Sequence, residues 1–119
     1  MQGGLSQSVR LLVLVAAFIT PVLPQQPPRD IATLKTAAEK GDAAAQFNLG
    51  VMYGTGQGVT QDYVLTHMWI NLAASRVKGD DQRKYAEVRD RVSAKMTSEQ
   101  IAEAQKRARR WKPGMPSMR

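Results

Sequence analysis

A short pattern that recurs at a fixed interval constrains most strongly what this chain can fold into. Two alanines, two polar residues and a Gly-Asp pair occupy residues 37–42, and two alanines followed by two polar residues return at 73–76. The next Gly-Asp pair stands at 79–80, two residues later than a strict repeat would place it. Periods of roughly 34–40 residues with two helices each are typical of α-solenoids. Small Ala side chains allow one helix to lie close against the next.

Capping and stop signals divide the chain beyond residue 29 into five predicted helices. Asp30, Asp42 and Thr60 are the expected N-caps of the first three, because their side chains can accept from free backbone N–H groups. The Gly79-Asp80 pair marks the start of the fourth, and Thr97 opens a capping box before the fifth. No segment alternates with period two over the length of a strand. The sequence therefore predicts an all-α fold, a short α-α solenoid of antiparallel helix pairs, with helices at about 31–40, 43–53, 61–75, 81–95 and 98–111.

Residues 41–76 resemble the Sel1-like repeat, a relative of the tetratricopeptide repeat. The family pattern reads G-D-x-x-A-Q-x-x-L-G-x-M-Y-x-x-G-x-G-V-x-x-D-Y, followed by W-x-x-x-A-A. Residues 96–113 are similar to the tail that closes many small bacterial Sel1-like proteins. Thr66 departs from the usual Ala, and the glycine after the Ala pair is displaced to Gly79. The matching positions are Gly41, Asp42, Ala45, Gln46, Leu49, Gly50, Met52, Tyr53, Gly56, Gly58, Val59, Asp62, Tyr63, Trp69, Ala73 and Ala74.

The resemblance implies antiparallel helix pairs in a right-handed superhelix, with the first helix of each pair lining a concave binding face. It implies scaffolding, adaptor or regulatory roles, often in bacterial envelopes. We expect a Sel1-like domain at 30–113, in which a full repeat at 41–76 precedes a diverged capping repeat at 79–111. Residues 114–119 are expected to form a loose tail. Because solenoids usually need about three repeats to bury a continuous core, we expect a partner or self-association to add stability.

The first 24 residues are predicted to be a secretory signal peptide. A polar segment with one positive charge is followed by the apolar run LLVLVAAFI at 11–19 and then by a helix-breaking proline at 21. The run is too short for an ordinary transmembrane helix. No A-x-A cleavage tripeptide ends it, so an uncleaved membrane anchor, or a misassigned start codon, stays an alternative. Residues 25–29 form a Pro-rich leader, and we expect the chain to be exported, periplasmic or secreted.

The residue types that support catalysis or metal binding are scarce. The chain has no Cys and a single His, which excludes disulfides, thiolate chemistry and His-rich metal sites. The glycines at 54–58 lack the strand and the Lys-Ser/Thr of a phosphate loop, so a turn is predicted there. His67 has no partner at a catalytic spacing and is expected to be a partly exposed helix residue. Trp69 and Trp111 are expected in the core. We predict a protein that is not an enzyme and has no cofactor or metal.

The second predicted helix carries the first group of candidate contact residues. Phe47, Asn48 and Val51 face away from the apolar stripe that this helix is expected to bury. Apolar side chains at such positions need a partner or a neighbouring repeat to cover them. We therefore predict that these three residues contribute to a concave face that binds another protein.

The basic run at 106–112 supplies the second group, with Lys106, Arg107 and Arg110 as its candidate contacts. The net charge of +7 comes entirely from residues 76–119, which hold 13 basic and 6 acidic side chains. The run can be a solvated helix end that complements the helix dipole, a contact for anionic lipid or envelope polymer, or a nucleic-acid patch. Export argues against nucleic acid.

Two functions follow as expectations. The first is a non-enzymatic protein–protein interaction, scaffold or regulatory module of the bacterial envelope, which binds an unidentified protein through its concave helix face. The alternative is a basic envelope-associated protein that adheres to anionic lipid or polymer through the run at 106–112. The sequence does not name the partner, because repeat scaffolds present surfaces rather than conserved chemistry.

Overall fold

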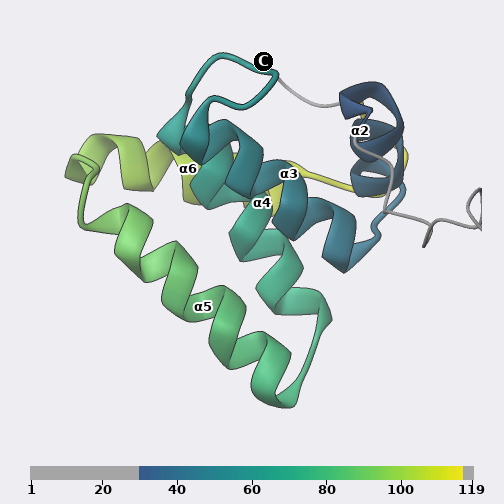
Figure 1. The fold of residues 1–119 in the computed structure, drawn as a ribbon. Helices are drawn as coiled ribbons and strands as arrows, with labels where there is room; N and C mark the ends of the chain where they lie inside the picture. Colours follow the sequence, from purple (N-terminus) through teal and green to yellow (C-terminus); the bar gives the residue numbers. More distant parts are fainter. Residues whose placement is uncertain (1–29, 117–119) are drawn as a thin grey trace, which may run out of the picture.

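The computed structural model describes residues 30–116, and this range contains five helices and no strand (Figure 1). The prediction of an all-α fold with packed neighbouring helices is confirmed. The predicted signal and leader at 1–29 lie outside the described residues. None of the helices between residues 30 and 116 has the length and apolarity needed to cross a membrane. The helices are α2 (Ile31–Glu39), α3 (Ala43–Thr55), α4 (Tyr63–Arg76), α5 (Gly79–Ser93) and α6 (Ser98–Arg110).

Helices α3 and α4 form the tightest pair in the fold. Gly50 on α3 permits their close approach, because a Cβ at this position would stand 2.6 Å from Ile70 Cγ1 on α4. The connecting loop starts with Gly56, whose left-handed φ of 71° ends α3. The N–H of Asp62 returns to the carbonyl of Tyr53 at 2.9 Å and closes the loop.

Helix α4 lies at the centre of the molecule, with α3, α5 and α6 packed around it. Nine of its 14 residues are buried, so apolar side chains occur all round it rather than along one stripe. Trp69 is fully buried and meets Trp111 edge to face, with ring centroids 5.9 Å apart. The guanidinium of Arg76 covers the outer side of Trp111 at 5.0 Å from its centroid. Both tryptophans therefore belong to the core, as predicted.

His67 is buried, and the prediction that it is partly exposed is wrong. Only 3% of its surface is exposed. The physical reason is that His67 lies on α4. Because α3, α5 and α6 pack around this helix, none of its faces is fully exposed to solvent. A single sequence shows a polar position on a helix, but not how many neighbours surround that helix.

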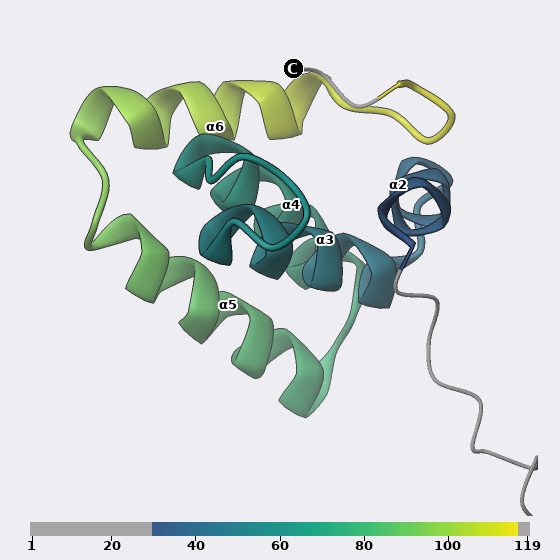
Figure 2. The same cartoon turned by 45° about the horizontal axis from the view of Figure 1, so that its top comes forward.

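The second helix pair is arranged differently from the first. Helices α5 and α6 both pack against α4 and diverge from their connecting turn, as Figure 2 shows. Helix α6 buries Ala104 and Ala108, whereas α5 buries only Tyr85. The pair is thus attached to the first repeat mainly through α4.

The helix boundaries agree with the sequence to within two residues, but α3 continues through Gly54 to Thr55, where a turn was predicted. Asp30, Asp42 and the Thr97 capping box act as predicted. Helix α4 is capped by Asp62, not Thr60, since the Asp62 carboxylate accepts from the N–H of Leu65 at 3.0 Å. Helix α5 begins at Gly79, and its N-cap makes no side-chain hydrogen bond.

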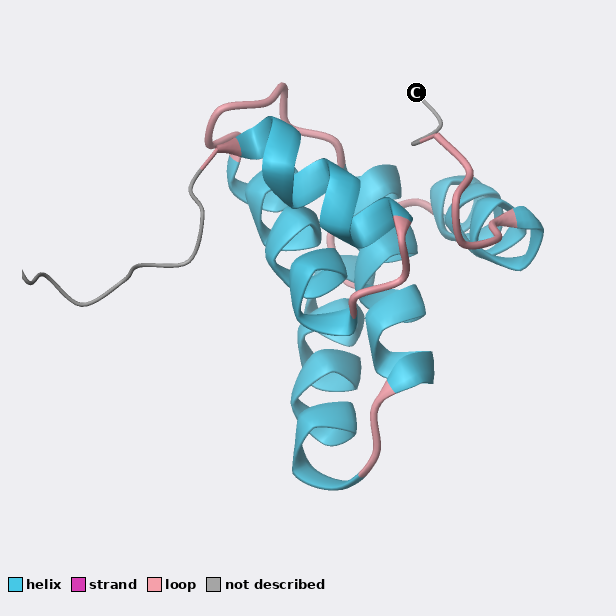
Figure 3. Ribbon diagram, turned by 90° about the vertical axis from the view of Figure 1, so that its right-hand side faces the viewer, coloured by secondary structure: helices cyan, strands magenta, loops and turns pink. Residues whose placement is uncertain are grey.

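The segment after α6 returns to the start of the fold, as Figure 3 shows. The N–H of Gly114 donates to the carbonyl of Glu39 at 2.7 Å, and Met115 packs against the main core cluster. Residues 114 and 115 of the tail are therefore docked against α2 rather than loose. Residues 117–119 lie outside the described range.

Candidate partner-binding surface

The outward face of α3 lies between two hollows. The larger, with a volume of about 630 Å³, opens between α2 and α3; the smaller, about 190 Å³, lies between α3 and α5 over α4. We name them the α2–α3 hollow and the α3–α5 hollow. Val51 lines both and is half-buried. The α2–α3 hollow is lined by Thr33, Leu34, Ala37, Asp42, Ala44, Ala45, Asn48, Val51, Met52 and Gln57.

The three candidate residues of α3 do not share one environment. Asn48 is exposed and lines the α2–α3 hollow beside Val51. Phe47 instead stacks on Tyr85 of α5, with ring centroids 4.3 Å apart and planes at 12°. The ammonium of Lys84 lies 5.5 Å from the Phe47 centroid. Helix α5 therefore covers Phe47, while Asn48 and Val51 stay accessible to a partner.

The α3–α5 hollow was not identified from the sequence. Its lining includes Arg91 and Lys95, which follow the apolar residues Val88 and Val92 by three positions each. Residues three apart share a helix face, so this spacing was the available signal. The full lining is Val51, Gly54, Thr55, Tyr63, Thr66, Ile70, Val88, Arg91, Val92 and Lys95.

The predicted basic contacts at the end of α6 are partly neutralised within the helix. Glu103 accepts from Arg107 Nε at 2.9 Å and lies 3.9 Å from Lys106 Nζ. The hydrogen bond from Arg107 holds the pKa of the Glu103 carboxyl below its usual range. Arg110 is exposed. Two of the three candidate cations thus share one carboxylate, which weakens the field that they present to an anion.

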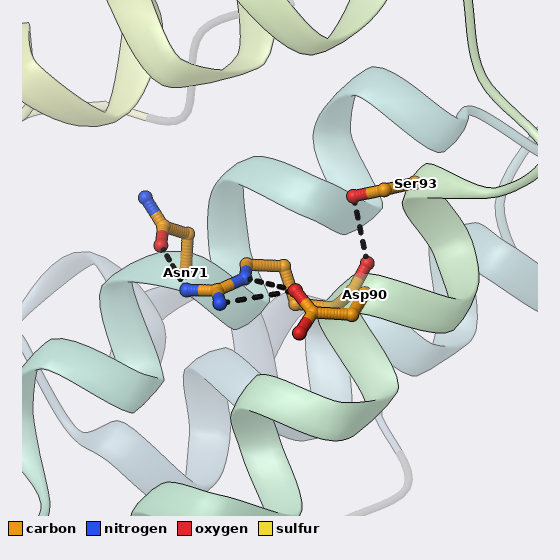
Figure 4. A network of polar contacts seen from close by, with 4 residues as sticks. Asn71, Asp90 and Ser93 are labelled. Carbon is orange, nitrogen blue, oxygen red and sulfur yellow. Dashed lines mark hydrogen bonds and ion pairs between the residues drawn. The ribbon is translucent and has the colours of Figure 1, made fainter.

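A polar network around Arg89 of α5 reaches Asn71 of α4 (Figure 4). Arg89 Nη1 donates to Asn71 Oδ1 at 2.9 Å, and Arg89 Nε donates to Asp90 Oδ1 at 3.0 Å. Ser93 Oγ donates to the Arg89 carbonyl at 3.1 Å. Burial of the imidazole, reinforced by the charge of Arg89, lowers the pKa of His67. Of these contacts, the hydrogen bond between Arg89 and Asn71 is the one that joins α5 to α4.

Metal coordination finds no support in the described part of the chain. Between residues 30 and 116, no group of three or more His, Asp or Glu side chains converges as a metal site would require.

Comparison with known protein families gives a match to part of the chain. Residues 43–76 match the Sel1 repeat, and these residues run from the first residue of α3 to the last of α4. No curated protein matches the chain, and no solved structure does. The unit found by sequence comparison is thus the same helix pair that packs most closely in the structure. The pair of α3 and α4 is a Sel1 repeat, and the chain carries a protein–protein interaction module.

Proposed function

We propose that this protein is a non-enzymatic scaffold or regulatory module that binds a protein partner on the outward face of α3. The observation that carries the proposal is the position of Val51, an apolar side chain between two hollows. Concave, largely apolar surfaces with a few polar groups are the usual places where proteins bind other molecules. The Sel1 repeat supports a protein as that molecule.

The same proposal places the protein in the bacterial envelope. It is supported by the polar start, the apolar run at 11–19 and the prolines that follow. Fractionation of cells that express the full chain tests this part separately. Recovery in the periplasm or the medium supports it, and recovery only in the cytoplasm contradicts it.

Site-specific photocrosslinking tests the binding face. A photoreactive amino acid replaces Asn48, which is exposed on α3, and in a matched variant replaces Ala102, which is exposed on α6. Irradiation of living cells should give a discrete protein adduct from position 48 and none, or a different one, from position 102. The same adduct from both positions, or no adduct from position 48, would contradict the proposed face.

A second candidate function is adhesion to an anionic envelope surface through the end of α6. Arg109, Arg110 and Lys112 are exposed and form no ion pair within residues 30–116. Each basic residue near an anionic membrane contributes about 1 kcal/mol, and this contribution is screened by salt. Co-sedimentation with phosphatidylglycerol vesicles should then fall steeply between about 20 and 150 mM salt. Equal sedimentation at both salt concentrations would exclude this function.

A further inference from the structure

The α3–α5 hollow has the size of one side chain. Its volume of about 190 Å³ is well below the roughly 300–1,000 Å³ of pockets for drug-sized ligands. A cavity of about 150 Å³ accommodates benzene. Val51, Ile70, Val88 and Val92 supply aliphatic surface from three helices. The hollow can therefore take one branched aliphatic or aromatic side chain of a partner.

The edge of this hollow is cationic. Arg91 lies in the last turn of α5 and Lys95 in the turn that follows this helix, and both side chains are exposed. Neither forms an ion pair in the described part of the chain, although Glu87 precedes Arg91 by one turn. Other arginines of α5 are paired, Arg83 with Asp80 and Arg89 with Asp90. No acidic side chain lines the hollow.

One hydroxyl at the edge is free to bind a peptide carbonyl. The Tyr63 hydroxyl accepts from Gln61 Nε2 at 3.3 Å, which leaves its own proton available to donate. The hydroxyl of Thr55 already donates to the Val51 carbonyl at 3.0 Å. An apolar floor, two unpaired cations and one hydroxyl donor thus surround the same opening.

We propose that the α3–α5 hollow binds an acidic segment of the partner protein, in which one aliphatic side chain is flanked by carboxylates. The aliphatic side chain occupies the hollow, and the carboxylates meet Arg91 and Lys95. This inference rests on the proposed function and names the chemistry of the partner. Charge complementarity selects an acidic peptide over a neutral or basic one, because like charges across an interface are strongly disfavoured.

Fluorescence polarisation with the full 119-residue chain tests the proposal. The probe is a fluorescein-labelled peptide of sequence GDELDEGS. One control peptide replaces Leu by Ser, and another replaces its Asp and Glu residues by Asn and Gln. We expect saturable binding of the probe and at least about tenfold weaker binding of either control, since each lacks one of the two complementary elements.

A pair of double variants separates local recognition from general electrostatic attraction. The variant Arg91→Glu/Lys95→Glu should lose binding about tenfold or more, because two attractive contacts become repulsive. The variant Arg109→Glu/Lys112→Glu makes the same change in net charge at the end of α6 and just beyond it, and should change the affinity less than about twofold. All four side chains are exposed, and far-UV circular dichroism confirms that both variants fold.

Each remaining outcome overturns the inference in a recognisable way. Equal losses in both double variants would show general electrostatic attraction, and unchanged binding of the Leu-to-Ser peptide would show that the hollow takes no side chain. If the protein binds phosphatidylglycerol vesicles and only the Arg91→Glu/Lys95→Glu variant loses this binding, the two cations contact a lipid surface instead of a peptide. If no peptide binds while the crosslink from position 48 persists, the proposed function stands and this inference fails. If neither the peptide binding nor the crosslink from position 48 is observed, the proposed function and this inference both fail.

Discussion

In the first helix pair, α3 and α4 pack against each other, whereas in the second pair α5 and α6 both pack against α4. Nine of 14 residues of α4 are buried, but only one of the 15 residues of α5 is. The first pair therefore contains most of the hydrophobic core, and the second pair contributes side chains to a core that α4 organises. Repeat proteins are stabilised by packing within each repeat and by packing between neighbouring repeats. In this chain the first pair packs within itself, whereas the second pair packs against α4 of the first.

The first prediction tests this difference between the two pairs by removing one large side chain from each of them. Trp69→Ala in α4 should cost about 3–5 kcal/mol, since the residue is fully buried. This is a large share of the roughly 5–15 kcal/mol that stabilises a typical domain. Tyr85→Ala in α5 should cost less, because the ring of Tyr85 stacks on the half-buried Phe47 and stays slightly exposed, whereas Trp69 is fully buried. Urea denaturation followed by circular dichroism gives both values, and equal costs would contradict a core centred on α4.

A second substitution tests the close approach inside the first pair. Gly50→Ala should destabilise by about 1–3 kcal/mol through overpacking against Ile70, although Ala favours a helix by about 1 kcal/mol over Gly. Gly54→Ala is the control, because its Cβ would meet only the Thr66 side chain, at 3.3 Å. We expect Gly54→Ala to be nearly neutral in the same denaturation experiment. A Gly50→Ala variant as stable as the Gly54→Ala control would show that α3 and α4 can move apart without a loss of folding free energy.

The third prediction concerns the pH dependence that arises where the two pairs meet. Burial and the nearby Arg89 lower the pKa of His67, while Asp90 acts weakly in the opposite sense. The unfolded chain then binds more protons than the folded chain as the pH falls below about 6.5. Stability is therefore fully present above this pH and is lost as the pH falls through the folded-state pKa.

His67→Gln isolates this effect, because His67 is the single histidine of the chain. The wild-type denaturation midpoint should decrease between about pH 7.5 and 5.5, and the variant should show a flatter profile over the same range. Glu103 titrates at lower pH and does not contribute in this window. Parallel profiles for the two proteins would show that His67 is solvated when the protein is folded.

Patterns along the chain predicted the helices and the Sel1 repeat, but they did not predict how the second pair would dock. Caps such as Asp42 and the Thr97–Gln100 box depend on neighbours within four residues. The burial of His67 and the stacking of Phe47 on Tyr85 depend on helices distant in sequence. Arg91 and Lys95 were not predicted as contact residues, because their place beside a hollow depends on α3 and α4.

The smallest predicted effect follows from removing one helix cap in each pair. The two pairs should differ in how many helices then show faster amide hydrogen exchange. Thr97→Ala removes the capping box of α6, and Asp62→Ala removes the cap of α4; each should cost about 1 kcal/mol. If the second pair depends on the first, loss of the α4 cap should speed amide hydrogen exchange throughout α3, α4, α5 and α6. Loss of the α6 cap should speed exchange in α6 alone, because a peripheral helix can open without unfolding the repeat that it covers. Exchange that increases everywhere in both variants would instead make the five helices a single cooperative unit, in which neither pair has priority.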